Sequence, residues 1–118
     1  MATISFKDLI VWQRGIELTK AVYQCTAKLP REEVYGLFSQ MRRSAVSIPS
    51  NIAEGHRRGS KKDFVQFLRI ADGSAAELET QLLLAHDIYS IDTKTADQLL
   101  IEVQKMLMSM IKKLNATR

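Results

Sequence analysis

Long rows of apolar side chains at helical spacing constrain this chain more than any other feature. Between Phe64 and Tyr89, eight apolar or aromatic residues recur every three or four positions and therefore share one helical face. The chain holds only two prolines and five glycines, and the alternating pattern typical of strands is scarce. The sequence therefore predicts an all-α protein.

Start and stop signals divide these rows into four helices. An S-x-x-D capping box at residues 5–8 is expected to begin the first helix, and a second box at residues 60–63 to begin the third. Pro30 ends the first helix, because the residue before a proline is pushed out of helical geometry. The fourth helix is expected to begin near Asp92 or Thr93.

Pro49 lies inside the second apolar row, where a proline costs about 3 kcal/mol if the segment is helical. A break in the helix would normally reset the phase of the row. The row from Met41 to Ile52 nevertheless keeps its phase through the proline. We therefore expect one continuous second helix that is kinked at Pro49 and ends at Gly55 or Gly59.

The same rows define the expected core. Its members are Val11, Leu18, Val22, Cys25 and Leu29, then Met41, Ala45, Ile48 and Ile52, then Phe64, Leu68, Ala71, Ala75, Leu78, Leu82, Ala85 and Tyr89, and finally Leu99, Leu100, Val103, Met106, Leu107, Met110 and Leu114. The small residues Gly73 and Ser74 are expected to mark a close crossing with another helix. Four helices with short connections pack best as an up-down-up-down antiparallel four-helix bundle. We expect residues 1–118 to form this single domain.

A second row on the second helix carries small or hydrogen-bonding side chains, namely Ser44, Ser47, Asn51 and Glu54. One interpretation is a tight contact between helices, in which Asn51 and Glu54 bond each other or the backbone that Pro49 leaves unpaired. The other interpretation is a surface that binds a ligand or a partner.

Positive charge is concentrated around the second helix. The segment from Arg42 to Lys62 holds six Lys and Arg residues against Glu54 alone, a net charge of +5 in a chain whose total is +4. The six candidates for nucleic-acid binding are Arg42, Arg43, Arg57, Arg58, Lys61 and Lys62. A guanidinium group suits phosphate because its planar fork can donate two hydrogen bonds. The two arginine pairs lie about four helical turns apart, so both are expected to project on one side of the helix.

The alternative is that these cations are only solvated or ion-paired. Acidic partners for such pairs are available in the third helix at Asp72, Glu77, Glu79 and Asp87. The segment has no interleaved exposed aromatic residues like those that stack on the bases of single strands. Binding to the phosphate backbone, with little readout of the bases, is therefore the expected mode.

The sequence indicates no catalytic or metal site. His56 and His86 lack the glutamate three residues earlier that di-iron bundles use, and both lie far along the chain from Cys25. No spacing predicts a Ser–His–acid set or a phosphate-binding loop. We therefore expect no enzymatic activity, no cofactor, no metal and no small-molecule substrate, and we interpret Cys25 as a buried, inert thiol.

A single cysteine allows no internal disulfide, which favours a reducing compartment. The first residues lack the apolar run and the cleavage site of a signal peptide. No apolar stretch approaches the roughly 18 residues needed to span a bilayer. We expect a cytoplasmic protein with no membrane partner.

Several motifs together resemble a known family. They are F-K-D-L at Phe6–Leu9, V-W-Q at Val11–Gln13, G-L at Gly36–Leu37, Q-M-R-R-S-A at Gln40–Ala45, S-I-P-S-N-I-A-E-G at Ser47–Gly55 and G-S-A-A-E-L-E-T at Gly73–Thr80. Over nearly its whole length the chain resembles the bacterial four-helix proteins encoded within intervening sequences of 23S ribosomal RNA genes. The resemblance implies a four-helix bundle that assembles into a ring, reported as a homopentamer, with a basic surface proposed to engage RNA or DNA.

Two functional hypotheses follow. The first is a non-enzymatic, RNA-binding homo-oligomer whose subunits pool their arginines on the phosphate backbone. Pooling matters because the few charges of one subunit bind weakly, whereas a ring multiplies the phosphate contacts. The second is a structural or adaptor oligomer that binds a protein partner through its extra apolar helix faces. Trp12 of the first helix fits either a core position or a subunit contact.

Overall fold

The computed structural model describes residues 5–116. This part of the chain forms η1 (Phe6–Asp8), α1 (Ile10–Thr26), η2 (Arg31–Glu33), α2 (Leu37–Arg57), α3 (Lys61–Tyr89) and α4 (Lys94–Ala116), where η denotes a short 3-10 helix. No strand occurs among the described residues. None of the described helices combines the length and hydropathy that crossing a bilayer requires.

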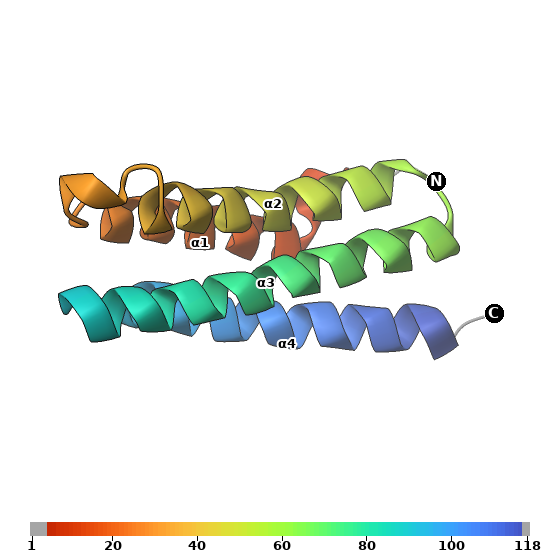
Figure 1. The fold of residues 1–118 in the computed structure, drawn as a ribbon. Helices are drawn as coiled ribbons and strands as arrows, with labels where there is room; N and C mark the ends of the chain where they lie inside the picture. The colour runs from red at the N-terminus through yellow and green to blue at the C-terminus, as the bar shows by residue number, and fades with distance from the viewer. Residues whose placement is uncertain (1–4, 117–118) are drawn as a thin grey trace.

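The four α-helices pack as an elongated bundle that measures 49 × 22 × 21 Å (Figure 1). The helix α2 packs against α1 and α3, and α4 packs against the same two neighbours. Figure 1 shows α2 and α3 side by side along the bundle. The predicted all-α four-helix bundle is therefore confirmed. The up-down-up-down order and the kink at Pro49 stay predictions of the sequence.

The core follows the predicted rows. All nine residues expected inside from the first two rows are buried, as is the middle of the third row from Leu68 to Ala85. The ends of the third row and much of the fourth row are partly buried against this core: Phe64, Tyr89, Leu99, Met106, Met110 and Leu114. Burial extends to apolar residues outside the predicted rows, which are Ala21, Val65, Ile91, Ala96 and Ile111.

The ends of the first helix differ from the prediction. The Ser5–Asp8 capping box forms, but it caps the 3-10 helix η1, and Leu9 is extended before α1 begins at Ile10. A capping box satisfies free amides of the first turn only, so it does not decide whether that turn continues as an α-helix. At the other end α1 stops at Thr26, ahead of Pro30, while the buried Leu29 packs from the connection.

Pro49 lies within a continuous α2, as the phase of the apolar row predicted. Because proline has no N–H, the carbonyl four residues earlier, that of Ala45, loses its helical donor. The hydroxyl of Thr19 in α1 shares its one proton between this carbonyl, 3.1 Å from Oγ1, and the carbonyl of Gly15, 2.8 Å from Oγ1. A Cβ at Gly15 would lie 3.4 Å from the Cβ of Pro49, so α1 and α2 are close here. A hydroxyl from the neighbouring helix thus supports the proline.

Replacing Thr19 by valine is expected to lower the free energy of unfolding by about 1–3 kcal/mol, because the Ala45 carbonyl, whose usual helical donor is missing at Pro49, would also lose the Thr19 hydroxyl. Valine has nearly the same shape and helix propensity, so the loss reports the hydroxyl. The matched control is Thr80→Val, since Thr80 makes an equivalent bond to the Ala76 carbonyl at 3.1 Å on an exposed surface. That variant is expected to change stability by less than about 0.5 kcal/mol in urea unfolding. Equal losses in the two variants would contradict the role assigned to Thr19.

The predicted polar row on α2 is part of the contact with α3. The hydroxyls of Ser47 and Ser74 lie 2.8 Å apart across the two helices. The Nδ2 of Asn51 donates to the Oγ and to the carbonyl of Ser47 at 2.9 and 2.8 Å. Tight contact is therefore confirmed. Neither of the two bonding patterns expected for Asn51 and Glu54 forms, because the Glu54 carboxylate pairs with Arg58 and the Ala45 carbonyl that Pro49 leaves unpaired is met by Thr19.

Gly73 was expected beside Ser74 at the helix crossing, and that expectation was wrong. Ser74 is buried at the contact with α2, whereas Gly73 is exposed. A Cβ added at Gly73 would meet no atom within 4 Å. Adjacent positions of a helix point about 100° apart, so only one of the two residues can face α2.

The connection between α1 and α2 is tied to the end of α3 through Glu33. The Oε1 of Glu33 accepts from the backbone N–H of Leu37 at 3.0 Å, and its Oε2 accepts from the hydroxyl of Tyr89. The bond from Tyr89 is the main cause that lowers the pKa of Glu33, and the amide of Leu37 adds to it. The same carboxylate raises the pKa of Tyr89.

Because folding favours the ionised form of Glu33, its contribution to stability is fully present above the ordinary pKa of 4.5. The contribution is lost as the pH falls through the lower pKa of the folded protein. Tyr89→Phe removes the main cause of the shift, so its stability is expected to decline less steeply below pH 4.5. Urea midpoints measured across pH check this, with Tyr35→Phe as the control because Tyr35 is 94% exposed. Parallel curves for wild type and Tyr89→Phe would refute it.

Candidate nucleic-acid interface

The turn between α2 and α3 brings basic residues from both helices to one end of the bundle. The backbone of Gly59 has φ of 84°, a left-handed value that favours glycine. The Oγ of Ser60 then accepts from the backbone N–H of Asp63 at 3.1 Å and caps α3, as predicted. With α2 ending at Arg57 and α3 beginning at Lys61, only three residues separate the two helices.

Arg43 and Arg57 lie on the outer surface of α2. Both are exposed, as is Ser50, which stands seven residues from each of them. A spacing of seven residues is close to two helical turns, so the three residues share one side of the helix. Within residues 5–116 neither arginine side chain makes a hydrogen bond or an ion pair.

Arg42 turns away from that side and lies against α1. Its Nε donates to Thr26 Oγ1 at 2.8 Å and its Nη2 to the carbonyl of Tyr23 at 3.2 Å. Its guanidinium carbon lies 4.1 Å from the ring centroid of Tyr23 and 4.0 Å from that of Phe38. These contacts join α1 to α2 and place the side chain apart from Arg43. The expectation that both members of each pair project on one side therefore fails for Arg42.

The other predicted cations surround the turn. The Nη2 of Arg58 lies 2.9 Å from Glu54 Oε2, in a pair whose side chains are 51% and 53% exposed. Such an exposed pair contributes about 0–1 kcal/mol, so a stronger anion can replace the carboxylate. Lys61 and Lys62 are both exposed on the first turn of α3.

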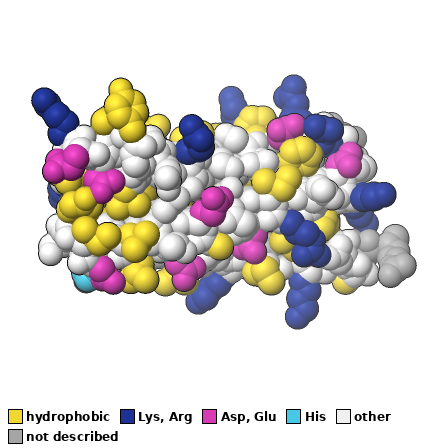
Figure 2. Space-filling view, viewed as in Figure 1, with side chains coloured by type: hydrophobic (Ala, Val, Ile, Leu, Met, Phe, Trp, Pro, Cys, Tyr) yellow, Lys and Arg dark blue, Asp and Glu magenta, His cyan; other side chains and the backbone are white. Residues whose placement is uncertain are grey.

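Arg69 is a further exposed cation on α3, although it was not among the predicted site residues. It is exposed on α3, seven residues after Lys62 and therefore on the same side of that helix. The spacing of seven residues between Lys62 and Arg69 is the signal in the sequence that could have identified it. We define the basic face by Arg43, Arg57, Arg58, Lys61, Lys62 and Arg69. Figure 2 shows more Lys and Arg side chains over the half of the molecule that carries the α2–α3 connection than over the other half, with acidic and hydrophobic side chains present in both halves.

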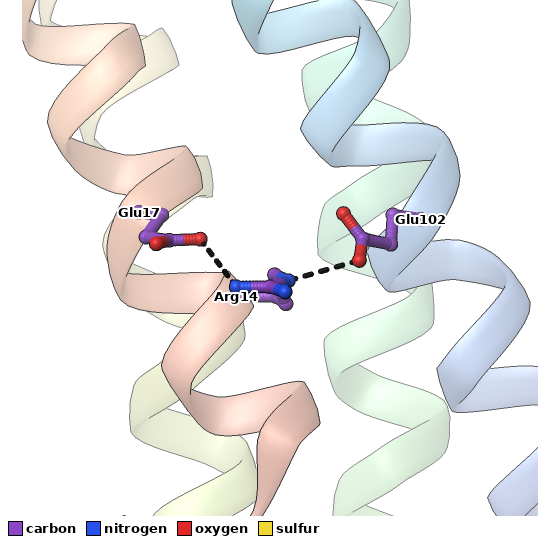
Figure 3. A network of polar contacts seen from close by, with 3 residues as sticks. All are labelled: Arg14, Glu17 and Glu102. Carbon is purple, nitrogen blue, oxygen red and sulfur yellow. Dashed lines mark hydrogen bonds and ion pairs between the residues drawn. The ribbon is translucent and has the colours of Figure 1, made fainter.

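Arg14, unlike the arginines of the basic face, has its charge balanced by two carboxylates. Its Nε lies 2.9 Å from Glu102 Oε1 and its Nη1 lies 3.0 Å from Glu17 Oε2, which joins α1 to α4 (Figure 3). The bond to Glu102 is the main cause that raises the pKa of Arg14. None of the ion pairs within the described part of the chain links the predicted arginines to the acidic residues of α3. Among residues 5–116, no group of three or more His, Cys, Asp or Glu side chains could hold a metal ion.

Comparison with known proteins places this geometry in a family. A family model described as 23S rRNA-intervening sequence protein matches residues 7–113. A crystal structure from Bacteroides thetaiotaomicron, of a protein with unknown function from the S23 ribosomal protein family, has a TM-score of 0.74 and 27% sequence identity. The match covers 87% of this chain and 99% of that one. No curated protein matches significantly.

Proposed function

Because the chain belongs to the 23S rRNA-intervening sequence protein family, we propose that it is a non-enzymatic RNA-binding protein that holds the phosphate backbone on its basic face. The observation that carries this proposal is that Arg43 and Arg57 are exposed on one side of α2 with no acidic partner within residues 5–116. Arg14, by contrast, is satisfied by two carboxylates. Unpaired guanidinium groups are free to take up phosphate oxygens.

Backbone binding fits the surroundings of these arginines. The aromatic side chains next to the turn, Phe64 and Phe67, are only partly exposed, and the guanidinium of Arg58 lies 5.0 Å from the Phe67 ring centroid. They do not offer the open ring faces on which bases stack. The contacts would therefore be electrostatic and largely independent of base sequence.

We also include self-association in the proposal. Large apolar side chains remain exposed on α3 and α4, including Ile88 at 62%, Ile101 at 52% and Met108 at 57%. A homo-oligomer, a pentamer in the form implied by the family resemblance, would cover such surfaces and would join the basic faces of several subunits. Several linked weak sites raise affinity through effective concentration.

Salt dependence tests the proposal most simply. The affinity for a labelled 23S ribosomal RNA fragment is measured by fluorescence anisotropy between about 50 and 200 mM KCl, and the solution mass is measured by light scattering. The expected result is a linear fall of log affinity with log salt that corresponds to about three to five phosphate contacts per subunit. A mass several-fold above the 13.4 kDa of one chain is expected as well. Absent or salt-insensitive binding would refute the RNA role, and a monomer would refute pooling.

A second candidate function is an adaptor that binds a protein through its apolar faces. The observation in its favour is Tyr35, which is 94% exposed in the connection between α1 and α2, next to Val34 at 42%. This candidate predicts a discrete protein partner that remains bound after nuclease treatment and is lost with Tyr35→Ala. Loss of the captured protein on nuclease treatment would favour the RNA role instead.

A further inference from the structure

Gly73 is a glycine that the fold of one chain does not explain. It lies in the interior of α3, with φ in the ordinary helical range, where glycine is less favourable than alanine. A Cβ there would meet nothing within 4 Å, so no neighbouring helix requires its absence. At Gly55, by contrast, a Cβ would lie only 2.6 Å from the Cβ of Phe67. The open space at Gly73 leaves the backbone of α3 accessible to a close approach from outside the chain.

The neighbours of Gly73 belong to the basic face. Arg69 precedes it by four residues, one helical turn, and is exposed on the same side of α3. Ser74 meets Ser47 across the helix contact at 2.8 Å, and Arg43 lies one turn before Ser47 on α2. Gly73 thus lies next to the α2–α3 contact in the sequence, with the exposed Arg69 one turn before it on α3 and the exposed Arg43 one turn before Ser47 on α2.

We propose that the RNA backbone runs along the α2–α3 side of the bundle and comes closest at Gly73, between Arg43 and Arg69. This inference rests on the proposed RNA-binding function. Arg43 and Arg57 are fourteen residues apart, which corresponds to about 21 Å along α2. The contact is thus a strip along the bundle, and the basic turn at 57–62 is one end of it. A phosphodiester chain fits this strip because its charge is opposite and because no Cβ holds it away from α3 at the central point.

Two pairs of variants test this location, with RNA affinity and solution mass as the readouts. The charge pair is Arg69→Glu and Lys105→Glu. Lys105 is exposed on α4 and lines the groove between α1 and α4, so the same change of charge falls on another side. The size pair is Gly73→Leu and Ser109→Leu. Ser109 lines the same groove.

Arg69→Glu and Gly73→Leu are each expected to weaken RNA binding at least about tenfold without changing the solution mass, because a charged contact is lost in one and the approach is blocked in the other. Lys105→Glu and Ser109→Leu are expected to stay within about threefold of wild type.

If wild type binds RNA but both members of a pair behave alike, the strip is refuted while RNA binding stands. If Gly73→Leu changes the mass and leaves RNA affinity intact, the space belongs to a second copy of the chain and the strip is refuted too. If wild type binds no RNA, the function itself fails.

Discussion

The double variant Arg57→Glu/Lys62→Glu is expected to bind RNA at least about a hundredfold more weakly than wild type. Each charged hydrogen bond contributes about 1.5–3 kcal/mol, and about 1.4 kcal/mol corresponds to a factor of ten. Both side chains are exposed, and neither makes an ion pair within residues 5–116. The change should therefore leave the fold intact and remove only contacts with an external anion.

The matched control is Lys20→Glu/Lys105→Glu, which changes the net charge by the same amount. Lys20 and Lys105 are exposed and line grooves between α1 and α4, away from the basic face. This control is expected to keep most of the affinity, and circular dichroism should report both variants as folded. Equal loss in the two variants would mean that total charge, rather than its position, governs binding.

Leu78→Ala is expected to have the largest effect on stability, about 2–5 kcal/mol. Leu78 is fully buried at 0% exposure in the middle of α3, so its truncation leaves a cavity that the surrounding helices fill only in part. A loss of this size is a large fraction of the roughly 5–15 kcal/mol that stabilises an ordinary domain. Urea unfolding measures it.

The control in the same helix is Leu83→Ala, because Leu83 is 60% exposed. The variant deletes the same side-chain atoms at a position where they are already exposed to water. It should change the free energy of unfolding by less than about 0.5 kcal/mol. Similar losses in Leu78→Ala and Leu83→Ala would contradict the assignment of the core to the inner row of α3.

Local patterns in the sequence were sufficient to predict the helices and most of the core. The phase of the row through Pro49 predicted a continuous helix, and the glycine and serine at 59–60 predicted the turn that gathers the cations. These features depend on neighbours within one or two helical turns. For that reason they can be read without knowing how the helices pack.

The details that the sequence did not predict depend on contacts between helices. The bond from Thr19 to the Ala45 carbonyl joins residues that are 26 positions apart, and no local pattern indicates it. The orientation of Arg42 depends on which side of α2 meets α1. Neighbouring residues diverge by about 100°, so the sequence did indicate that Arg42 and Arg43 point in different directions, but not which of them meets α1.

Footprinting of lysines in the wild-type protein tests the central claim most directly. The chain is acetylated briefly with and without the 23S ribosomal RNA fragment, and the modification of each lysine is read by mass spectrometry. Binding along the basic face predicts that RNA protects Lys62 strongly and leaves Lys20 and Lys105 as reactive as in the free protein. Uniform protection of all three lysines, or protection of Lys20 and Lys105 with Lys62 unchanged, would contradict it.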